Sequence, residues 1–139
     1  MGRIVAIDYG SKRTGIAVSD EMQIIAGGLT TVPSGETVDF LCRYAAQEKV
    51  DLFVVGHPKQ MNNEPSANMR PVTSFVNRLH KMLPDIPIEL FDERFTSVLA
   101  HKAMIDGGLR KKQRQDKALV DEISATIILQ DYLEKKRNM

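Results

Sequence analysis

The stretch RIVAIDYGSKRTGIAV, residues 3–18, decides the fold and carries the first candidate site. Its opening run IVAI is short, apolar and rich in β-branched residues, which predicts a buried strand. The run stops at Asp8, and we expect a turn through Gly15 that carries the cations Lys12 and Arg13. The apolar run IAV then follows at hairpin distance. The stretch predicts a β-hairpin with an acid at a strand end; an ordinary hairpin that merely terminates on Asp8 is the alternative.

The overall composition indicates one domain over residues 1–139, long enough to bury a core without disulfides. A net charge of +1 says nothing about partners, but residues 110–117 hold five cations and one anion. A single cysteine, Cys42, excludes an internal disulfide and fits a reducing compartment. The start of the chain lacks the apolar run of a signal peptide, and no stretch has the length of a membrane span. We therefore expect a cytoplasmic protein without a membrane partner.

The remaining pattern alternates strands with helices. Strands are predicted at 23–32, 51–56 and 88–91, and helices at 36–49, 69–83, from 96 or 97 to 106, and at 117–136. On the last helix we expect Leu119, Val120, Ile123, Ile127, Ile128 and Leu133 to form the apolar face. Gly27 and Gly28 make a bulge plausible in the third strand. Three hairpin-connected strands followed by crossovers predict an α/β fold with a five-stranded mixed sheet: an antiparallel meander plus two parallel strands, with helices on both faces.

Three acids stand where such a fold would bring them together. Asp8 and Glu93 follow two different strands, and Asp121 lies on the last helix with the small residues Ser124 and Ala125 on its face. Convergent carboxylates repel one another unless a cation lies between them, and Mg²⁺ or Mn²⁺ prefers such oxygen ligands. Two metal ions could activate water and stabilise a leaving oxygen in phosphodiester hydrolysis. An edge position that lets Asp121 reach solvent is the alternative.

Four segments carry a resemblance to a known family. They are IDYGSKRTGIAVSD, VVGHPKQMNNE, FDERFTS and KALVDEISATIILQDYLE, and together they span nearly the whole chain. The sequence resembles the YqgF/RuvX family, a Holliday-junction-resolvase-like group also described as pre-16S rRNA nucleases. The resemblance implies an RNase H-like fold with Asp8, Glu93 and Asp121 as the catalytic, metal-binding acids. These are the three acids that the residue pattern selects.

Basic residues flank these acids in the sequence. The candidate nucleic-acid contacts are Lys12, Arg13, Arg94, Lys111, Lys112, Arg114 and Lys117. Contacts of this kind to phosphates give an affinity that falls steeply with salt and carries no base specificity. A merely solvated charge run is the alternative for residues 110–117.

The leading hypothesis is a metal-dependent endonuclease that processes the 5′ end of pre-16S rRNA during ribosome biogenesis. The alternatives are a Holliday junction resolvase that acts on branched DNA and a non-catalytic nucleic-acid-binding factor. An actin-like or sugar-kinase-like ATPase is a more distant reading, because such proteins need two domains around the nucleotide. The expected oligomeric state is a monomer or weak homodimer. His57, after the fourth strand, is a candidate proton shuttle or a surface histidine.

Overall fold

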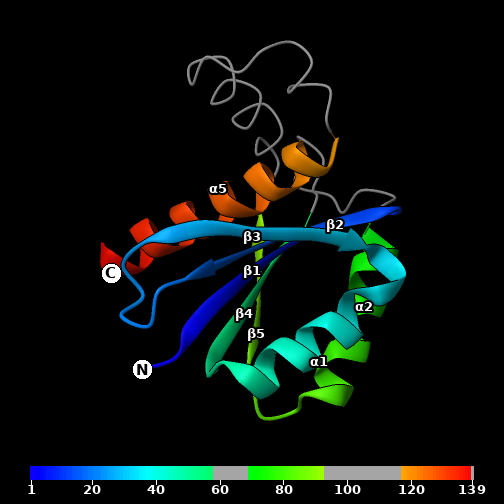
Figure 1. Ribbon diagram of the computed structural model, residues 1–139, viewed down its shortest axis with the longest axis horizontal. Coiled ribbons are helices and arrows are strands. Elements are labelled where there is room, and N and C mark those ends of the chain that lie inside the picture. Colours follow the sequence, from blue (N-terminus) through cyan, green and yellow to red (C-terminus); the bar gives the residue numbers. More distant parts are fainter. Residues whose placement is uncertain (58–68, 93–116, 139) are drawn as a thin grey trace.

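A computed structural model describes residues 1–57, 69–92 and 117–138 of the chain. Within these residues, one five-stranded sheet has the strand order β3-β2-β1-β4-β5 (Figure 1). The strands are β1 (Arg3–Tyr9), β2 (Arg13–Ser19), β3 (Ala26–Pro33), β4 (Val50–His57) and β5 (Ile88–Asp92). The helices are a 3₁₀ turn η1 (Ser34–Glu36), α1 (Thr37–Gln47), α2 (Met69–Met82) and α5 (Lys117–Arg137).

The sheet is mixed, as the sequence predicts. Strand β2 pairs antiparallel with both β1 and β3, which makes the N-terminal meander. Strand β4 pairs in parallel with β1 and β5. Helix α1 precedes β4 and helix α2 precedes β5, and each of these crossovers returns the chain to the edge of the sheet where the parallel strands begin. The carboxyl ends of β1, β4 and β5 therefore lie at one edge, where loops of an open α/β sheet meet ligands.

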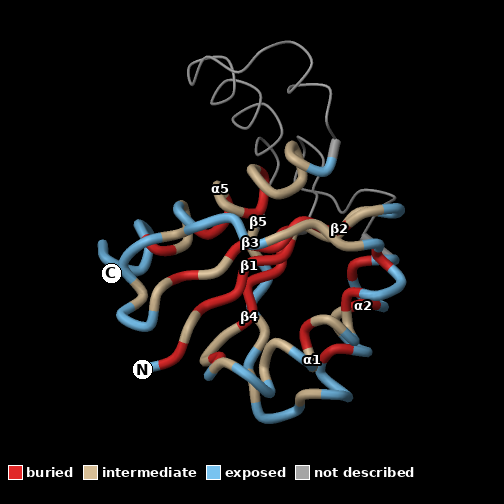
Figure 2. The backbone as a smooth tube through the Cα atoms, in the orientation of Figure 1, coloured by how far each residue is buried: buried red, intermediate tan, exposed pale blue. Residues whose placement is uncertain are grey.

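Helices cover both faces of the sheet, and each face has its own apolar core (Figure 2). Successive residues of β1 point to opposite faces. Val5 and Ile7 enter the core that α1 and α2 close, which also contains Leu41, Phe53, Phe75 and Leu79. Ile4 and Ala6 enter the core that α5 closes, with Ala17, Val54, Ala125, Ile128, Leu129 and Leu133. The predicted α/β architecture with helices on both faces is confirmed.

The third strand begins at Ala26, so the predicted start at residue 23 is wrong. A turn occupies the missing positions, because the Asp20 carboxylate accepts hydrogen bonds from the backbone N–H groups of Met22, Ile24 and Ile25. Gln23 has a positive φ of 59° in this turn, which a strand does not allow. A polar side chain that binds nearby backbone groups therefore prevails over the apolar pattern of the segment.

A β-bulge interrupts the pairing of β2 with β3, as the glycine pair in the sequence predicts. Ile16 lies opposite Thr30 and Ala17 lies opposite Gly28, so Leu29 is the extra residue on β3. Such a bulge bends its strand and increases the local twist. Strand β3 can thereby follow the sheet while it stays in contact with α5 above it (Figure 1).

The face that α5 turns to the sheet matches the predicted apolar face only at Ile128 and Leu133. The fully buried residues of α5 are Ser124, Ala125, Ile128, Leu129 and Leu133, whereas Leu119, Val120, Ile123 and Ile127 are only half-buried. Both faces of this helix are apolar, so periodicity alone does not indicate which one packs on the sheet. The buried face is the one that also carries Asp121.

Several sequence predictions fall on residues outside the described ranges. These are the helix predicted from residue 96 or 97 and most of the basic loop at 110–117. His57 is the last residue of β4, so its backbone belongs to the strand rather than to the predicted loop. Of the helices that the structure describes, none combines the length and apolar character needed to cross a membrane.

Candidate active site

Asp8 lies one residue before the end of β1, on the face of the sheet that α5 covers. Ile4 and Ala6 of the same strand point into the core beneath α5, and a period of two residues gives Asp8 the same direction. Its partner across the β1–β2 ladder is Gly15. Because paired residues of neighbouring strands face the same side, the Asp8 side chain stands beside a position without a side chain.

Asp121 lies on α5, directly above that position. A Cβ atom on Gly15 would meet the backbone carbonyl oxygen and carbon of Asp121, so the main chain of the helix rests on the main chain of β2. Ala125 and Ile128, on the same face of α5, are fully buried against the sheet. The Asp121 backbone therefore lies over the residue that pairs with Asp8, although Asp8 and Asp121 are 113 positions apart in the chain (121 − 8).

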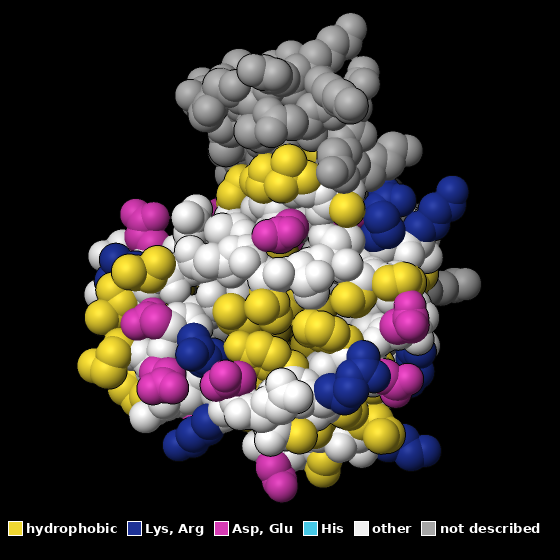
Figure 3. Space-filling model, viewed as in Figure 1, with side chains coloured by type: hydrophobic (Ala, Val, Ile, Leu, Met, Phe, Trp, Pro, Cys, Tyr) yellow, Lys and Arg dark blue, Asp and Glu magenta, His cyan; other side chains and the backbone are white. Residues whose placement is uncertain are grey.

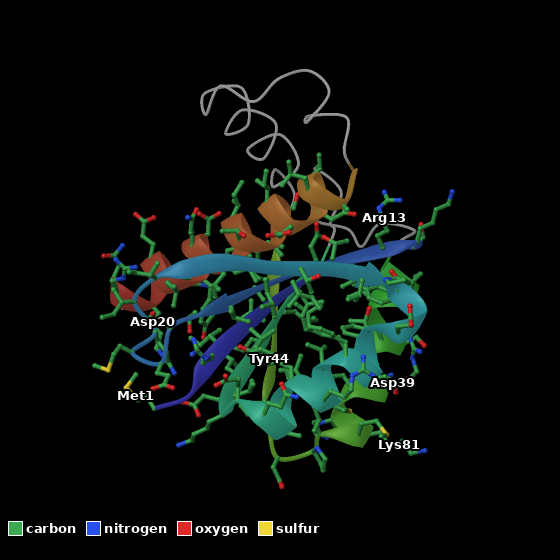
Figure 4. The ribbon with its side chains drawn as sticks, in the orientation of Figure 1. Met1, Arg13, Asp20, Asp39, Tyr44 and Lys81 are labelled. Carbon is green, nitrogen blue, oxygen red and sulfur yellow. The ribbon has the colours of Figure 1, made fainter. Side chains whose placement is uncertain are left out.

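Arg13 supplies a positive charge at the same place. Its Nε donates a hydrogen bond to Asp121 Oδ2 at 3.0 Å, which makes an ion pair between the start of β2 and α5. Like Gly15, Arg13 is an odd-numbered residue of β2 and shares its face of the sheet. Figure 4 labels Arg13 at the start of β2, close to the first turns of α5. The pair is partly open to solvent, with 38% of the Arg13 side chain and 26% of the Asp121 side chain exposed.

The turn between β1 and β2 is fixed by a buried hydroxyl. Ser34 Oγ donates to the carbonyl oxygen of Gly10 and is hydrogen-bonded to Thr14 Oγ1 at 2.9 Å. The Ser34 backbone N–H also donates to the carbonyl oxygen of Lys12 at 3.0 Å. These bonds tie the turn to the end of β3, so the cations of the turn project from a rigid support.

The predicted phosphate contacts have different positions in the structure. Lys12 is exposed in the β1–β2 turn, and Figure 3 shows Lys and Arg side chains on the surface where β2 begins. Arg13 instead turns toward Asp121. Lys117 is the first residue of α5. The other predicted residues, Glu93, Arg94, Lys111, Lys112 and Arg114, lie outside the described ranges.

Two of the three predicted acids, Asp8 and Asp121, lie around Gly15 on the same face of the sheet, and the third, Glu93, follows Asp92, the last residue of β5. Among the residues at 1–57, 69–92 and 117–138, no three His, Cys, Asp or Glu side chains form a group suited to a metal ion. Asp8 and Asp121 offer carboxylate oxygens only, the donors that hard divalent ions prefer. The guanidinium on Asp121 further indicates that this position accepts a cation. The residues present fit a divalent ion such as Mg²⁺ or Mn²⁺.

Three features of the site are not predicted from the sequence: the role of Gly15, the hydrogen bond between Ser34 and Thr14, and the ion pair of Arg13. The sequence predicts a turn at Gly15, but Gly15 lies within β2 and permits the contact with α5. A glycine inside a strand pattern is a signal for close backbone approach, so its role was open to prediction. Ser34 and Thr14 form a contact across 20 residues, which no local pattern indicates. The ion pair of Arg13 joins residues 108 positions apart, so local patterns do not predict it either.

Comparisons with known proteins identify relatives of the chain. The chain is 66% identical to a protein of Phocaeicola vulgatus over 137 residues, covering 99% of both chains. It is 67% identical to one of Bacteroides fragilis, again over 99% of both. Each of these relatives bears the name "Putative pre-16S rRNA nuclease".

Among solved structures, Thermus thermophilus RuvC in complex with a Holliday junction substrate aligns with a TM-score of 0.59. The alignment covers 99% of this chain and 96% of RuvC at 13% identity, which supports the fold and the predicted RNase H-like class. The sequence model of the RuvX family, described as Holliday junction resolvase, matches residues 2–135. With nearly its whole length matched, the chain belongs to the RuvX family.

Proposed function

We propose that this protein is a divalent-metal-dependent nuclease that hydrolyses phosphodiester bonds, with Asp8, Glu93 and Asp121 as its catalytic acids. The proposal is supported by the contact of α5 with Gly15, because Gly15 pairs with Asp8 and lies under the backbone of Asp121 on one face of the sheet. Carboxylates from a strand end and from a packed helix have little freedom to separate. Their arrangement is suited to holding a cation at the edge where the parallel strands end.

The metal ligands in this proposal are the same three acids. Mg²⁺ or Mn²⁺ bound there would lower the pKa of a water molecule and offset negative charge on the leaving oxygen. The chain itself supplies the rest: Asp8 and Asp121 orient the ion, and the fixed β1–β2 turn presents a cation to the phosphate. Removing one acid should abolish cleavage while leaving the fold intact.

The proposed substrate is the 5′ region of pre-16S rRNA, because relatives that are two-thirds identical over their full length bear that name. This substrate would place the enzyme in the cytoplasm. The family description favours a second candidate, a four-way DNA junction. A nucleic-acid-binding factor without cleavage activity is the third. The proposed phosphate contacts are Lys12, Arg13, Arg94, Lys111, Lys112, Arg114 and Lys117, in a protein that acts as a monomer or weak homodimer.

A cleavage assay tests the proposal. Purified protein is incubated with a pre-16S 5′-leader RNA or a synthetic four-way DNA junction, in Mg²⁺, in Mn²⁺ or in EDTA. The test variant is Asp8→Asn, and the matched control is Asp39→Asn, which neutralises an exposed acid of α1 on the opposite face of the sheet. We expect metal-dependent cutting of the RNA by the wild type and by Asp39→Asn, and none by Asp8→Asn.

Other outcomes distinguish the candidates. Cutting of the junction but not of the RNA would assign the protein to DNA processing. Binding of either substrate without cutting would favour the accessory factor. Metal-dependent cleavage that persists in Asp8→Asn would remove the carboxylate site from the mechanism altogether.

A further inference from the structure

The ion pair between Arg13 and Asp121 joins the start of β2 to α5 through a hydrogen bond. The Nε atom of Arg13, rather than one of its terminal nitrogens, donates to Asp121 Oδ2 at 3.0 Å. The guanidinium therefore lies against a carboxylate that the proposed function assigns to a metal ion. A divalent ion and this guanidinium would compete for the same oxygen.

A divalent ion can reach the pair because both side chains are partly exposed to solvent. About a third of the Arg13 side chain is exposed, 38%, so the guanidinium can leave Asp121 without the helix moving. Partly exposed ion pairs contribute little net free energy and break easily. A divalent ion that contacts both Asp8 and Asp121 carries twice the charge of Arg13 and has a second carboxylate to bind.

The backbone at Arg13 is held by its neighbours, whereas its side chain is partly exposed. Arg13 begins β2, where it pairs with Pro33, and the preceding turn is bound by Ser34. A released guanidinium would thus stay at the edge of the sheet beside the acids. Guanidinium groups bind phosphate oxygens through parallel N–H donors, so the released group is suited to a substrate phosphate.

We propose that Arg13 is the counter-ion of Asp121 in the metal-free protein, and that a divalent ion displaces it from Asp121 onto the phosphate of the substrate. This inference rests on the proposed function for the identity of the metal ligands. Arg13 then exchanges Asp121 for a phosphate of the substrate when the ion binds. In the metal-free state Arg13 offsets repulsion between the acids, and in the metal-bound state it faces the nucleic acid.

Metal affinity measured without nucleic acid tests whether Arg13 competes with a divalent ion for Asp121. Mn²⁺ binding is followed by the electron paramagnetic resonance signal of the free ion for wild type, Arg13→Gln and Lys12→Gln. The matched control is Lys12→Gln, because this substitution also removes one positive charge, at an exposed position of the turn next to Arg13. Both variants lose one positive charge, but only Arg13→Gln loses the competitor. We expect Arg13→Gln to bind Mn²⁺ about fivefold more tightly than Lys12→Gln does, the effect of one partly exposed ion pair.

A direct observation of the guanidinium tests the exchange. The Arg13 Nε–H resonance, assigned by its absence from Arg13→Lys, is followed by NMR during titration with diamagnetic Mg²⁺. We expect it to shift in the wild type as the ion binds, and to show no such change in Asp121→Asn.

Equal or weaker Mn²⁺ affinity in Arg13→Gln than in Lys12→Gln would overturn the proposal, since a purely structural pair would hold Asp121 in place for the metal. An unchanged Nε–H resonance at saturating Mg²⁺ would overturn it as well. Both readouts are independent of cleavage. A failure of the nuclease assignment, seen as cleavage that survives Asp8→Asn, is thereby distinguished from a failure of the Arg13 exchange.

Discussion

Replacing Gly15 with alanine tests whether the main-chain contact between β2 and α5 holds the candidate site together. The added Cβ would meet the carbonyl group of Asp121, which is backbone and has no rotamer by which to escape. The helix must retreat by roughly 1.5 Å to restore an ordinary van der Waals contact. Asp121 would move away from Asp8 by a similar distance, so metal affinity and cleavage should both fall.

The size of the stability loss follows from what α5 buries. Ile128, Leu129 and Leu133 are its large, fully buried apolar side chains, and burial of each contributes about 2 kcal/mol. A gap of about 0.5–1 Å already forfeits a quarter to a half of the contact energy, so this larger gap forfeits about half or more. Gly15→Ala should therefore lower the free energy of unfolding by about 3 kcal/mol, at the upper end of the range measured for overpacked cores. For a chain of this length the melting temperature should fall by roughly 6–12 °C.

The assay is urea denaturation followed by circular dichroism, with Gly27→Ala as the matched control. Gly27 lies in β3, and a Cβ atom there would meet nothing within 4 Å. Both substitutions restrict the unfolded chain equally, which alone stabilises by about 0.4–1 kcal/mol. The difference in free energy of unfolding between Gly15→Ala and Gly27→Ala therefore measures the contact between β2 and α5. If Gly15→Ala unfolds at the same urea concentration as Gly27→Ala, the helix does not rest on β2 as described and the reasoning fails.

Three further perturbations probe the frame around the site. Ser34→Ala removes a buried hydroxyl that binds the β1–β2 turn and should cost about 1–3 kcal/mol in urea unfolding, whereas Ser74→Ala, exposed on α2, should cost less than about 0.5 kcal/mol. Burial, assisted by a hydrogen bond to Glu89, raises the pKa of Tyr132 to about 12. The folded state therefore holds this proton more tightly than the unfolded state, so stability should fall as the pH rises from 10 toward 12, and less steeply in Tyr132→Phe. Backbone hydrogen bonds lower the pKa of Asp20, so its stabilising effect should be present at pH 7 and should decline as the pH falls below 3.8. Asp20→Ala should unfold at a lower urea concentration than wild type at pH 7, and the difference between the two should narrow as the pH falls below 3.8.

Local patterns were sufficient to predict the strands and the two faces of the sheet. The run at residues 4–7 and the unbroken apolar strand before Gly56 are both buried as expected. The order of hairpin and crossover connections then fixes which strands are parallel. The start of β3 was misjudged because Asp20 binds three backbone N–H groups, a preference that an apolar pattern conceals.

The candidate site was predictable only in part, for a related reason. Asp8 stands at a strand end and Asp121 on a small-residue helix face, and both features are visible in the sequence. Their separation in space depends on how closely α5 approaches β2, which Gly15 decides from more than 100 residues away (121 − 15 = 106). The partner of Arg13 is set by that same approach, so the prediction of a phosphate contact missed the ion pair. The roles of Glu93 and of the cations at 94–114 stay predictions.

The position of α5 in the chain has a consequence for the newly made protein. The five strands that the structure describes precede α5, and among the described helices α5 is the one that closes the core containing Ile4, Ala6 and Ala17. A ribosome that has synthesised the whole sheet still holds a chain with one apolar face uncovered and with Asp121 absent. On the proposed function, such a nascent chain cannot cut RNA. If the proposed function holds, competence requires that α5 has left the ribosome and docked, so that a half-made chain would not cleave the RNA around it.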